Sequence, residues 1–329
     1  MSLPTPQRHT LHTTLAPMFG FLAAGSVAPT AWADAPAATP NDSVVSLPQI
    51  KVDGQEATST FKVDRVTSAK ISQPLLDAPQ SVTIVPQQVL KEQNAQTLQE
   101  VLRNVPGITF MSGEGNLGWG DLFSIRGFSS EQSLTVDGVR DAGMSTRTDT
   151  FNLQQAEVFK GTGSIESGVS AVGGSVNLVS KEAHLGDANK VSAGIGTDSY
   201  RRLTADLNKQ LTDTTAVRIN LMKHYNQVAD RDDVDYDRWG IATSFGFGLG
   251  TDTRFFVDTF YQKDTNTPDG GVPIQRGTDG HRMPGVKRSD WYGDSSLYTQ
   301  ENATTSLTAR FEHDFDWHDA HPVSYTHLR

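Results

Sequence analysis

The segment Gly113–Gly118 reads GEGNLG and matches the pattern G-x-G-x-x-G of dinucleotide-binding proteins. In those proteins the glycines let the backbone approach a pyrophosphate at the start of a helix. A strand is predicted before the pattern here, but the residues after it, WGDLFSIRG, have no helical character. The pattern therefore predicts a glycine-rich loop and not a nucleotide site.

Histidine and aspartate gather near residue 320, where they could supply metal ligands. A metal site needs such side chains to converge from fixed positions. The candidates straddle the end of a predicted strand and a turn without regular spacing: His313, Asp314, Asp316, His318, Asp319 and His321. This favours a solvated turn over a metal site. No nucleophile, base and acid stand out as a set, so neither an enzyme nor a cofactor is expected.

Two arginines lie in the segment Phe123–Asp141, FSIRGFSSEQSLTVDGVRD, in which apolar and polar residues alternate. Asp137-Gly138 is a strong turn signal, so we predict two short strands around a turn, with Arg126 in one arm and Arg140 in the other. A buried arginine needs a carboxylate partner, because an unpaired buried charge is very costly. What these arginines bind therefore depends on what surrounds the hairpin.

The bulk composition excludes several classes of protein. The 329 residues carry a formal net charge of −10, which argues against a nucleic-acid-binding protein with a basic patch. There is no cysteine, so disulfides and thiolate metal sites are excluded. The mean hydropathy is −0.41, and no apolar run reaches the roughly 18 residues of a membrane helix. A membrane β-barrel is still allowed, because alternating strands dilute the hydropathy.

Residues 1–33 have the features of a secretory signal peptide. Arg8 precedes an apolar stretch, and Ala31 and Ala33 occupy the two small-residue positions of a cleavage site. A buried N-terminal helix is the alternative, but prolines and glycines interrupt the apolar stretch. Residues 34–70 follow as a polar linker that contains proline.

One apolar-polar alternation stands inside this linker, at Leu47–Val52. It could be a short strand of the domain that follows. The alternative is a peptide that adds as a strand to the sheet of another protein.

Residues 71–185 indicate an α+β domain. The β-branched segment SVTIVP predicts a strand, and Pro86 then opens a helix in the first turn, where proline fits. A second helix has Thr97 and Glu100 in the spacing of a capping box and is predicted to end at Asn104. GITF and GSVNLVSK are predicted as further strands.

Residues 186–329 change to long alternating segments of about ten residues, the length of a tilted membrane strand. In TTAVRINLMKHYNQ, Val217 and Leu221 share one face, and Arg218 and Asn220 share the other. Short turns and long polar loops alternate along the chain, as in outer-membrane barrels. A soluble β-sandwich also alternates, but its strands average about five or six residues.

Taken in order, these segments resemble the TonB-dependent outer-membrane receptors, in which an N-terminal plug fills a 22-stranded barrel. The plug signatures are APQSVTIVPQQVLKEQNAQTLQEVLRNVPGI, SIRGF, VDGVRD, AEVFKG and GGSVNLVSK. NTPDGG (Asn266–Gly271) and the segment from WYGDSS to RFEHDF resemble the catecholate-siderophore receptors more specifically. The turn after AEVFKG reads GTGSIESG and lacks the proline and tyrosine that are usual in the family.

The resemblance implies a fold class: an α+β plug domain followed by antiparallel β-strands of a truncated outer-membrane β-barrel. It implies a receptor of the bacterial outer membrane that binds and imports a ferric siderophore of catecholate type. TonB in the periplasm, the siderophore and membrane lipid are the expected partners. The alternatives are a receptor for another ligand, such as a hydroxamate siderophore, and a secreted soluble β-rich binding protein. The resemblance also assigns the TonB box: Leu47, Pro48, Gln49, Ile50, Lys51 and Val52.

The same resemblance assigns four residues of the plug. Arg126 and Lys160 occupy the basic positions that pair with carboxylates of the barrel wall, here expected on late strands. Arg140 is expected to face solvent or a loop. Trp119 and Arg147 lie in apical loops, and an aromatic ring and a guanidinium suit a bulky aromatic anion.

The length of the chain carries a further expectation. A closed barrel of 22 strands, at about ten residues each plus turns, needs far more residues than follow residue 188. The sequence therefore predicts about six or seven barrel strands with open edges, whose N–H and C=O groups cannot lie in hydrocarbon unpaired.

Overall fold

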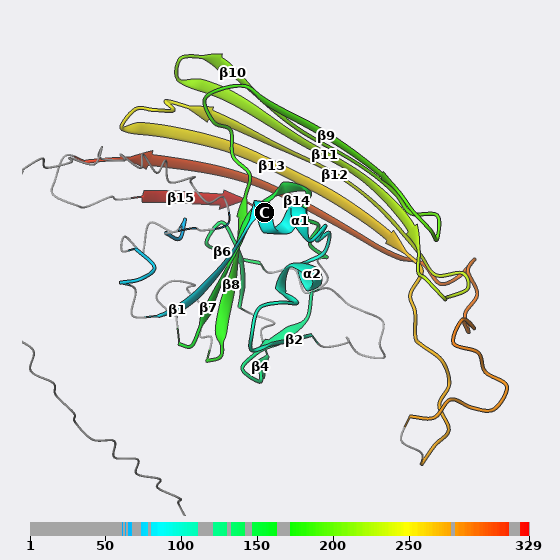
Figure 1. Cartoon of the computed structure of the whole chain (residues 1–329). Helices are drawn as coiled ribbons and strands as arrows, with labels where there is room; N and C mark the ends of the chain where they lie inside the picture. The colour runs from blue at the N-terminus through cyan, green and yellow to red at the C-terminus, as the bar shows by residue number, and fades with distance from the viewer. Residues whose placement is uncertain are drawn as a thin grey trace, which may run out of the picture. The chain divides into compact units, whose positions relative to one another are not determined.

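The computed structural model describes residues 61, 63, 65–67, 74–77, 80–110, 121–129, 133–141, 147–162, 172–277, 280–315 and 323–328. All of them belong to one compact unit, Glu56–Arg329. Figure 1 shows two parts of this unit: a small α+β part and a long sheet of antiparallel strands. The described residues before residue 187 are called the plug region below, and the long sheet is called the wall.

The plug region is built on a five-stranded sheet in the order β1-β7-β8-β5-β6. Neighbouring strands are antiparallel, except that β5 and β8 run parallel. The strands are β1 (Ser81–Pro86), β5 (Leu134–Val136), β6 (Val139–Arg140), β7 (Leu153–Lys160) and β8 (Gly174–Ser180). The predicted strands SVTIVP and GSVNLVSK thus form, and they lie in the same sheet.

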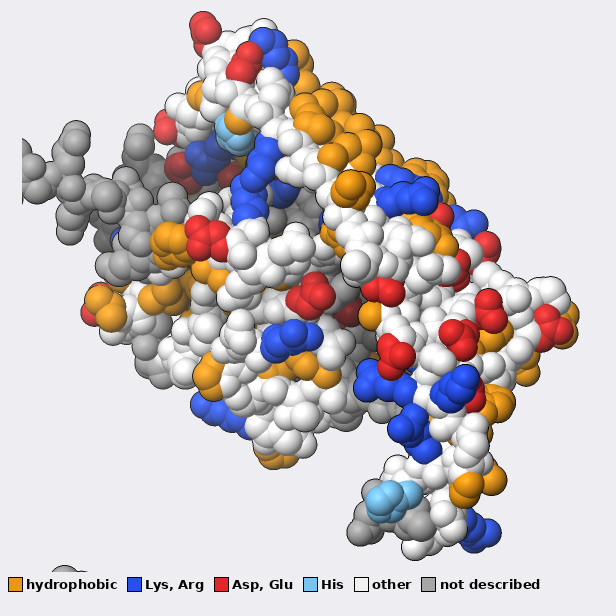
Figure 2. Space-filling view, turned by 45° about the vertical axis from the view of Figure 1, so that its right-hand side comes forward, with side chains coloured by type: hydrophobic (Ala, Val, Ile, Leu, Met, Phe, Trp, Pro, Cys, Tyr) orange, Lys and Arg blue, Asp and Glu red, His pale blue; other side chains and the backbone are white. Residues whose placement is uncertain are grey.

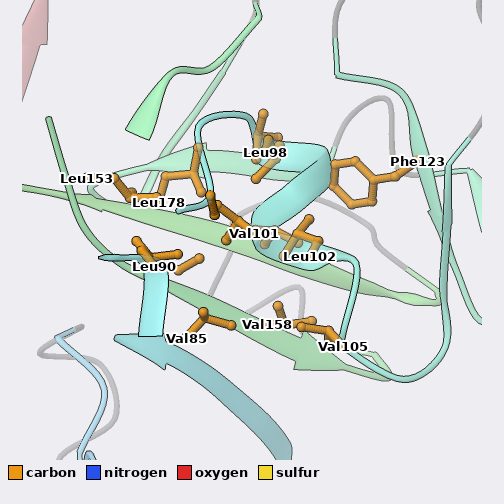
Figure 3. Close-up of a cluster of buried hydrophobic side chains, with 14 of the residues drawn as sticks. Val85, Leu90, Leu98, Val101, Leu102, Val105, Phe123, Leu153, Val158 and Leu178 are labelled. Carbon is orange, nitrogen blue, oxygen red and sulfur yellow. The ribbon is translucent and has the colours of Figure 1, made fainter. Parts of the chain in front are cut away.

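Two short helices, α1 (Gln87–Glu92) and α2 (Leu98–Leu102), pack against this sheet. Figure 3 shows their apolar side chains meeting those of the strands. Leu98 and Leu102 are completely buried. The other labelled members of the core are Val85, Leu90, Val101, Val105, Phe123, Leu153, Val158 and Leu178. Burial of these apolar side chains is the main force that holds the plug region together.

Helix α2 begins with the predicted capping box. The hydroxyl of Thr97 accepts a hydrogen bond from the Glu100 N–H at 3.3 Å, and the Glu100 carboxylate accepts one from the Thr97 N–H at 3.2 Å. The helix ends at Leu102, two residues before the predicted Asn104. Pro86 is the N-cap of α1 and the last residue of β1, because its backbone is extended (φ −77°, ψ 162°).

The opposite face of the plug sheet carries a buried polar cluster. Glu157 on β7 is fully buried and accepts hydrogen bonds from three groups. They are Asn177 Nδ2 at 3.0 Å, Gln155 Nε2 at 2.7 Å and the backbone N–H of Thr67 at 2.6 Å. Asn177 Oδ1 in turn accepts from the Gly138 N–H at 2.9 Å. The segment around Thr67, which precedes β1, is thus attached to the plug sheet through a buried carboxylate.

The segment with two arginines folds differently from the prediction. It forms two tight hairpins in two different sheets. Arg126 and Gly127 make the first turn, with φ of 53° and 83°, and Asp137 and Gly138 make the second, with φ of 50° and 79°. Positive φ at both central positions is the I′ turn that suits hairpins. The first hairpin belongs to a three-stranded sheet of β2 (Ile108–Phe110), β3 (Phe123–Ile125) and β4 (Phe128–Ser129).

The wall is a seven-stranded antiparallel sheet in which strands adjacent in sequence are paired. Strands β10 to β14 contain 12 to 14 residues, long enough to cross a bilayer when tilted, and β9 contains 8. The strands are β9 (Ala188–Ile195), β10 (Arg201–Thr212), β11 (Thr215–Gln227), β12 (Asp235–Phe247), β13 (Thr253–Asn266), β14 (Gln300–His313) and β15 (Val323–Leu328).

The two faces of the wall have the reverse of the polarity found in soluble sheets. On β11, Arg218 and Asn220 are 9% and 1% exposed, whereas Leu221 is 40% exposed. On β12, Trp239 and Phe247 on the outer face are exposed as well. Figure 2 shows apolar side chains gathered along the outer face of the strands. Polar residues thus face the plug region, and apolar residues face outward, as in a sheet surrounded by lipid.

Aromatic pairs lie near both ends of the outer face. Trp239 and Tyr261 have ring centroids 4.9 Å apart toward one end, and Phe247 and Phe255 have centroids 6.3 Å apart toward the other. Such girdles mark the two interfaces of a membrane barrel. No helix within the described residues is long and apolar enough to span a membrane.

The four connections between β10 and β14 sort by end, as predicted. Short turns join β10 to β11 and β12 to β13, whereas residues 228–234 and 267–299 form longer connections at the opposite end. In outer-membrane barrels the long loops face the outside of the cell. This sorting assigns the end with the long loops to the outer surface.

Candidate functional site

A cavity of about 830 Å³ lies between the plug region and the wall, toward the end that carries the long loops. Strands β11 and β12 and the turn before β10 form its wall side. Aromatic, basic and acidic side chains line it, including Phe110, Asp121, Arg147, Tyr200, His224, Tyr236 and Arg238. Its size and position make this outer cavity the candidate ligand site.

Arg147 lines the outer cavity, and its role as a ligand residue stays a prediction. Its guanidinium carbon lies 5.7 Å from the centre of the Tyr236 ring, within the range of a cation–π contact. Its backbone carbonyl accepts a hydrogen bond from Gln262 Nε2 at 2.5 Å. The wall therefore holds this segment in place, and the guanidinium and ring together suit an aromatic anion.

Asp121 lines the same cavity, and its carboxyl group loses its proton at a higher pH than usual. One of its carboxylate oxygens accepts a hydrogen bond from the Thr148 N–H at 2.7 Å. Burial raises the pKa of Asp121 to about 6, and the bond from Thr148 opposes this shift only in part. Below that pH the cavity loses a negative charge, which favours an anionic ligand.

A buried ion-pair cluster joins the plug region to the wall next to this cavity, and its Arg238 also lines the cavity. The side chain of Asp149 is completely buried and accepts hydrogen bonds from Arg202 at 2.6 and 2.9 Å and from Arg238 at 3.1 Å. Arg238 also contacts Asp264 on β13. Burial alone would raise the pKa of Asp149, but the two guanidiniums outweigh it and hold that pKa below its usual value.

A second cluster fixes the end of the plug region where it joins the wall. Lys181 Nζ lies 3.0 Å from the carboxylate of Asp206, which also accepts from Arg218 at 2.8 Å. Arg310 on β14 pairs with Glu182 at 2.5 Å. Burial lowers the pKa of Lys181 to about 8, against the opposing effect of Asp206. These contacts leave the last residues of the plug region bound to three wall strands.

Residues 74–175 match the TonB-dependent receptor plug domain. Over 271 residues the chain is 38% identical to the catecholate siderophore receptor Fiu of Escherichia coli O157:H7, which covers 78% of this chain and 35% of that protein. The chain belongs to the family of TonB-dependent receptors.

Two solved structures of TonB-dependent receptors share this fold. The ferric-catecholate import receptor Fiu of E. coli K12, in its closed form, has a TM-score of 0.73 at 37% identity over 78% of this chain. The siderophore receptor PiuA of Acinetobacter baumannii gives the same three values. The chain spans 38% and 37% of those two structures, so it corresponds to a little over a third of their length.

These matches confirm the predicted fold class, an α+β plug domain followed by antiparallel strands of an outer-membrane β-barrel. They also confirm the predicted location, because TonB-dependent siderophore receptors are proteins of the bacterial outer membrane. The apolar outer face of the wall agrees with that location.

The two basic residues predicted to lock the plug to the barrel lie together. Arg126 is exposed at its hairpin turn, and its Nη1 is 3.5 Å from where a Cβ on Gly161, next to Lys160, would lie. Burial, and then the charge of Arg126, lowers the pKa of Lys160. Among the described residues neither forms an ion pair, so the pairing with late wall strands stays a prediction. Arg140 is exposed at the end of β6, as expected.

Sequence reasoning did not find the junction at Asp149. The sequence does contain a pattern that indicates such a junction. Arg202, Arg238 and Asp264 are charged residues on the polar faces of alternating strands. Charges on the inner face of a barrel must pair with the plug or with one another. The wall therefore indicates charged partners in the plug, but it does not say which ones.

Several predicted positions lie outside the described residues: Trp119, the TonB box Leu47–Val52, the Gly113–Gly118 loop and the pair His318 and His321. Among the described residues no group of three histidines or carboxylates could hold a metal ion. His313 instead shares a hydrogen bond with Thr253 Oγ1 at 2.7 Å and packs on the ring of Phe315.

Proposed function

We propose that this chain supplies the plug and the first wall strands of a TonB-dependent receptor that binds and imports a ferric siderophore of catecholate type. The observation that carries the proposal is the outer cavity, in which Arg147 lies beside the ring of Tyr236. A ferric catecholate is bulky, aromatic and anionic, and it offers a face for the ring and charge for the guanidinium.

The similarity to Fiu and PiuA supports the same ligand class. Fiu is a catecholate siderophore receptor and PiuA is a siderophore receptor, and both are similar to this chain over most of its length. Import of this kind needs binding and movement but no bond chemistry, so we assign no catalytic residue and no cofactor.

Energy for import would come from TonB, which we propose binds the segment Leu47–Val52 by strand addition. An extended, alternating peptide in a polar linker can add its backbone hydrogen bonds to the edge of another sheet. In this proposal a pull on that segment changes the plug and releases the ligand toward the periplasm.

Substitution of Arg147 tests the ligand assignment in a receptor that carries this chain and a complete barrel. Arg147→Ala should weaken binding of a ferric tris-catechol complex by about tenfold or more, because a hydrogen bond to a charged group is lost. Trp119→Ala should weaken it by less. Arg140→Ala is the matched control, since Arg140 lies exposed at the end of β6, and it should bind like the parent.

The outcome also separates the alternatives. If both the Arg147 and Trp119 variants bind the catechol complex like the parent, the apical side of the plug is not the site. A parent that takes up a ferric hydroxamate and not the catechol complex is a receptor for the other siderophore class.

A further inference from the structure

A second cavity, of about 260 Å³, lies farther from the long loops, between helix α1 and strands β9 and β10. It is called the inner cavity here. It shares Asn94, Gln96 and Tyr200 with the outer cavity. The two cavities are therefore neighbours along one seam between the plug and the wall, and they meet at these three residues.

A neutral side-chain contact crosses the seam at this meeting point. Gln96 Nε2 of the plug donates a hydrogen bond to the Tyr200 hydroxyl of the wall at 2.5 Å. The Tyr200 ring lies edge-on to the His224 ring, with centroids 5.4 Å apart. It also lies against Gly194 of β9, where a Cβ would come within 3.3 Å of the ring. The glycine thus gives the ring room to reach the plug.

This contact is weaker than the joins beside it. Gln96 and Tyr200 are neutral and only partly buried, whereas Asp149 is completely buried between two guanidiniums. Lys181 and Asp206 form another charged join farther along the seam. A neutral hydrogen bond that water can replace opens far more easily than a buried charge cluster. If the plug separates from the wall on this side, it separates first at Gln96 and Tyr200.

The inner cavity has an excess of positive charge. Lys91, Lys181, Lys190 and Arg202 line it together with the carboxylate of Asp206. Because Arg202 is paired with Asp149 and Lys181 with Asp206, the excess charge is that of Lys91 and Lys190, which are both exposed. Lys91 comes from the plug and Lys190 from the wall, and after burial the charge of Lys190 is the next cause that lowers the pKa of Lys91. An anion held between these two lysines would remove their repulsion.

We propose that Gln96 and Tyr200 form a gate, and that the inner cavity behind it is a second binding site for an anionic, oxygen-rich ligand. The ligand would pass from the outer cavity through this seam into the inner one. The passage rests on the proposed function of import, and the ligand class follows from the basic lining. Because the inner cavity is smaller than the outer one, entry requires the plug to move away from β9 and β10.

A covalent tether tests the passage. The chain has no cysteine, so Gln96→Cys and Tyr200→Cys introduce a unique pair that a bis-maleimide can bridge in the complete receptor. The tethered receptor should bind a ferric tris-catechol complex like the parent but should lose uptake. The control is the pair Ala183→Cys and Ser244→Cys, which joins plug to wall where the parent already has a hydrogen bond of 3.0 Å. Because both positions are buried, this pair is closed by oxidation to a disulfide and not by the linker. That tether should leave uptake intact.

Two outcomes would overturn the gate. Normal uptake with the seam tethered would mean that the ligand passes elsewhere, and loss of uptake with both tethers would mean that this seam has no special role. A parent that takes up no ferric catechol complex would contradict the proposed function. The gate then needs a readout that does not depend on the ligand.

Thiol labelling supplies that readout. Thr204 lines the inner cavity and is only partly exposed, so Thr204→Cys can report access from outside when an impermeant maleimide is added to cells without TonB. With Tyr200→Ala the reporter cysteine should react about fivefold to tenfold faster, the effect expected when one hydrogen bond is lost. With Tyr200→Phe its rate of labelling should lie between that of Tyr200→Ala and that of the parent. Equal labelling rates in the parent, Tyr200→Phe and Tyr200→Ala would show that Tyr200 does not restrict access to the inner cavity.

Discussion

At the scale of single residues, the junction between plug and wall depends on the carboxylate of Asp149. Arg202 and Arg238 share this anion away from water. Asp149→Ala would leave both guanidiniums buried without it, which costs on the order of 3–5 kcal/mol. We expect the purified receptor variant to unfold at a clearly lower denaturant concentration, measured by equilibrium denaturation in detergent.

Asp187 offers the matched control for this prediction. Its ion pair with Lys209 lies at the surface, where the Asp187 side chain is 46% exposed. Exposed pairs contribute little to stability, so Asp187→Ala should keep the midpoint of the parent. Equal shifts in the two variants would mean that the buried cluster is no stronger than a surface pair.

The lowered pKa of Asp149 also determines how its contribution to stability changes with pH. A carboxylate with a lowered folded pKa stabilises fully above its unfolded pKa of about 4, and this stabilisation is lost as the pH falls through the folded value. The difference in stability between parent and Asp149→Ala should therefore narrow below about pH 4. A difference that stays constant to pH 2 would indicate that the charge of Asp149 is not what stabilises the junction.

The sequence predicted some of these residues and not others for a physical reason. Arg147 could be placed in an apical loop because the motifs around it are local. Asp149 pairs with residues 53 and 89 positions away, and no local pattern encodes such a pairing. Only the folded chain brings these side chains together.

At the scale of elements, the segment Leu47–Val52 is predicted to act as a strand when TonB binds it. Strand addition uses backbone N–H groups and an extended chain, and proline removes one N–H. Ile50→Pro in the complete receptor should abolish uptake and leave siderophore binding unchanged, measured with the iron complex on intact cells. Ser43→Pro, upstream in the same linker, should take up iron normally. Normal uptake by Ile50→Pro would remove this assignment.

Strands and helix starts were the elements most open to prediction. The alternation of β11 and the capping box of α2 each express a local rule that the fold obeys. The sequence predicts one hairpin where the structure has two, because Arg126 occupies a left-handed backbone position that favours glycine or asparagine. A non-glycine residue there hides the first turn. Strand order in the plug sheet, where β5 lies parallel to β8, depends on contacts that no local pattern specifies.

At the scale of the whole molecule, the wall should tolerate charge on its outer face only near its ends. Leu221 lies in the middle of β11, and Leu211 lies beside the short turn that ends β10. An arginine on the lipid face costs about 2–4 kcal/mol at the bilayer centre and about 0–1 kcal/mol near the interface. Leu221→Arg should therefore reduce the heat-modifiable, folded fraction of the receptor in outer membranes, and Leu211→Arg should reduce it much less. Similar losses in both variants would mean that this face does not lie against lipid.

The plug is attached unequally at its two ends, and this determines how it yields under tension. Thr67, at the end nearer the segment Leu47–Val52 that we propose binds TonB, is held by hydrogen bonds to Glu157 and Gln155. Lys181 and Glu182, at the other end, are held to the wall by ion pairs. A load applied from the N-terminal side reaches the hydrogen bonds first. In force spectroscopy on the reconstituted receptor, we expect an early low-force step that Thr67→Pro abolishes. A trace that keeps this step would place the weak point elsewhere. Under tension, the contacts at the N-terminal end of the plug should therefore break first, while the ion pairs at its other end hold it to the wall. The plug can then return to its place when the tension ends.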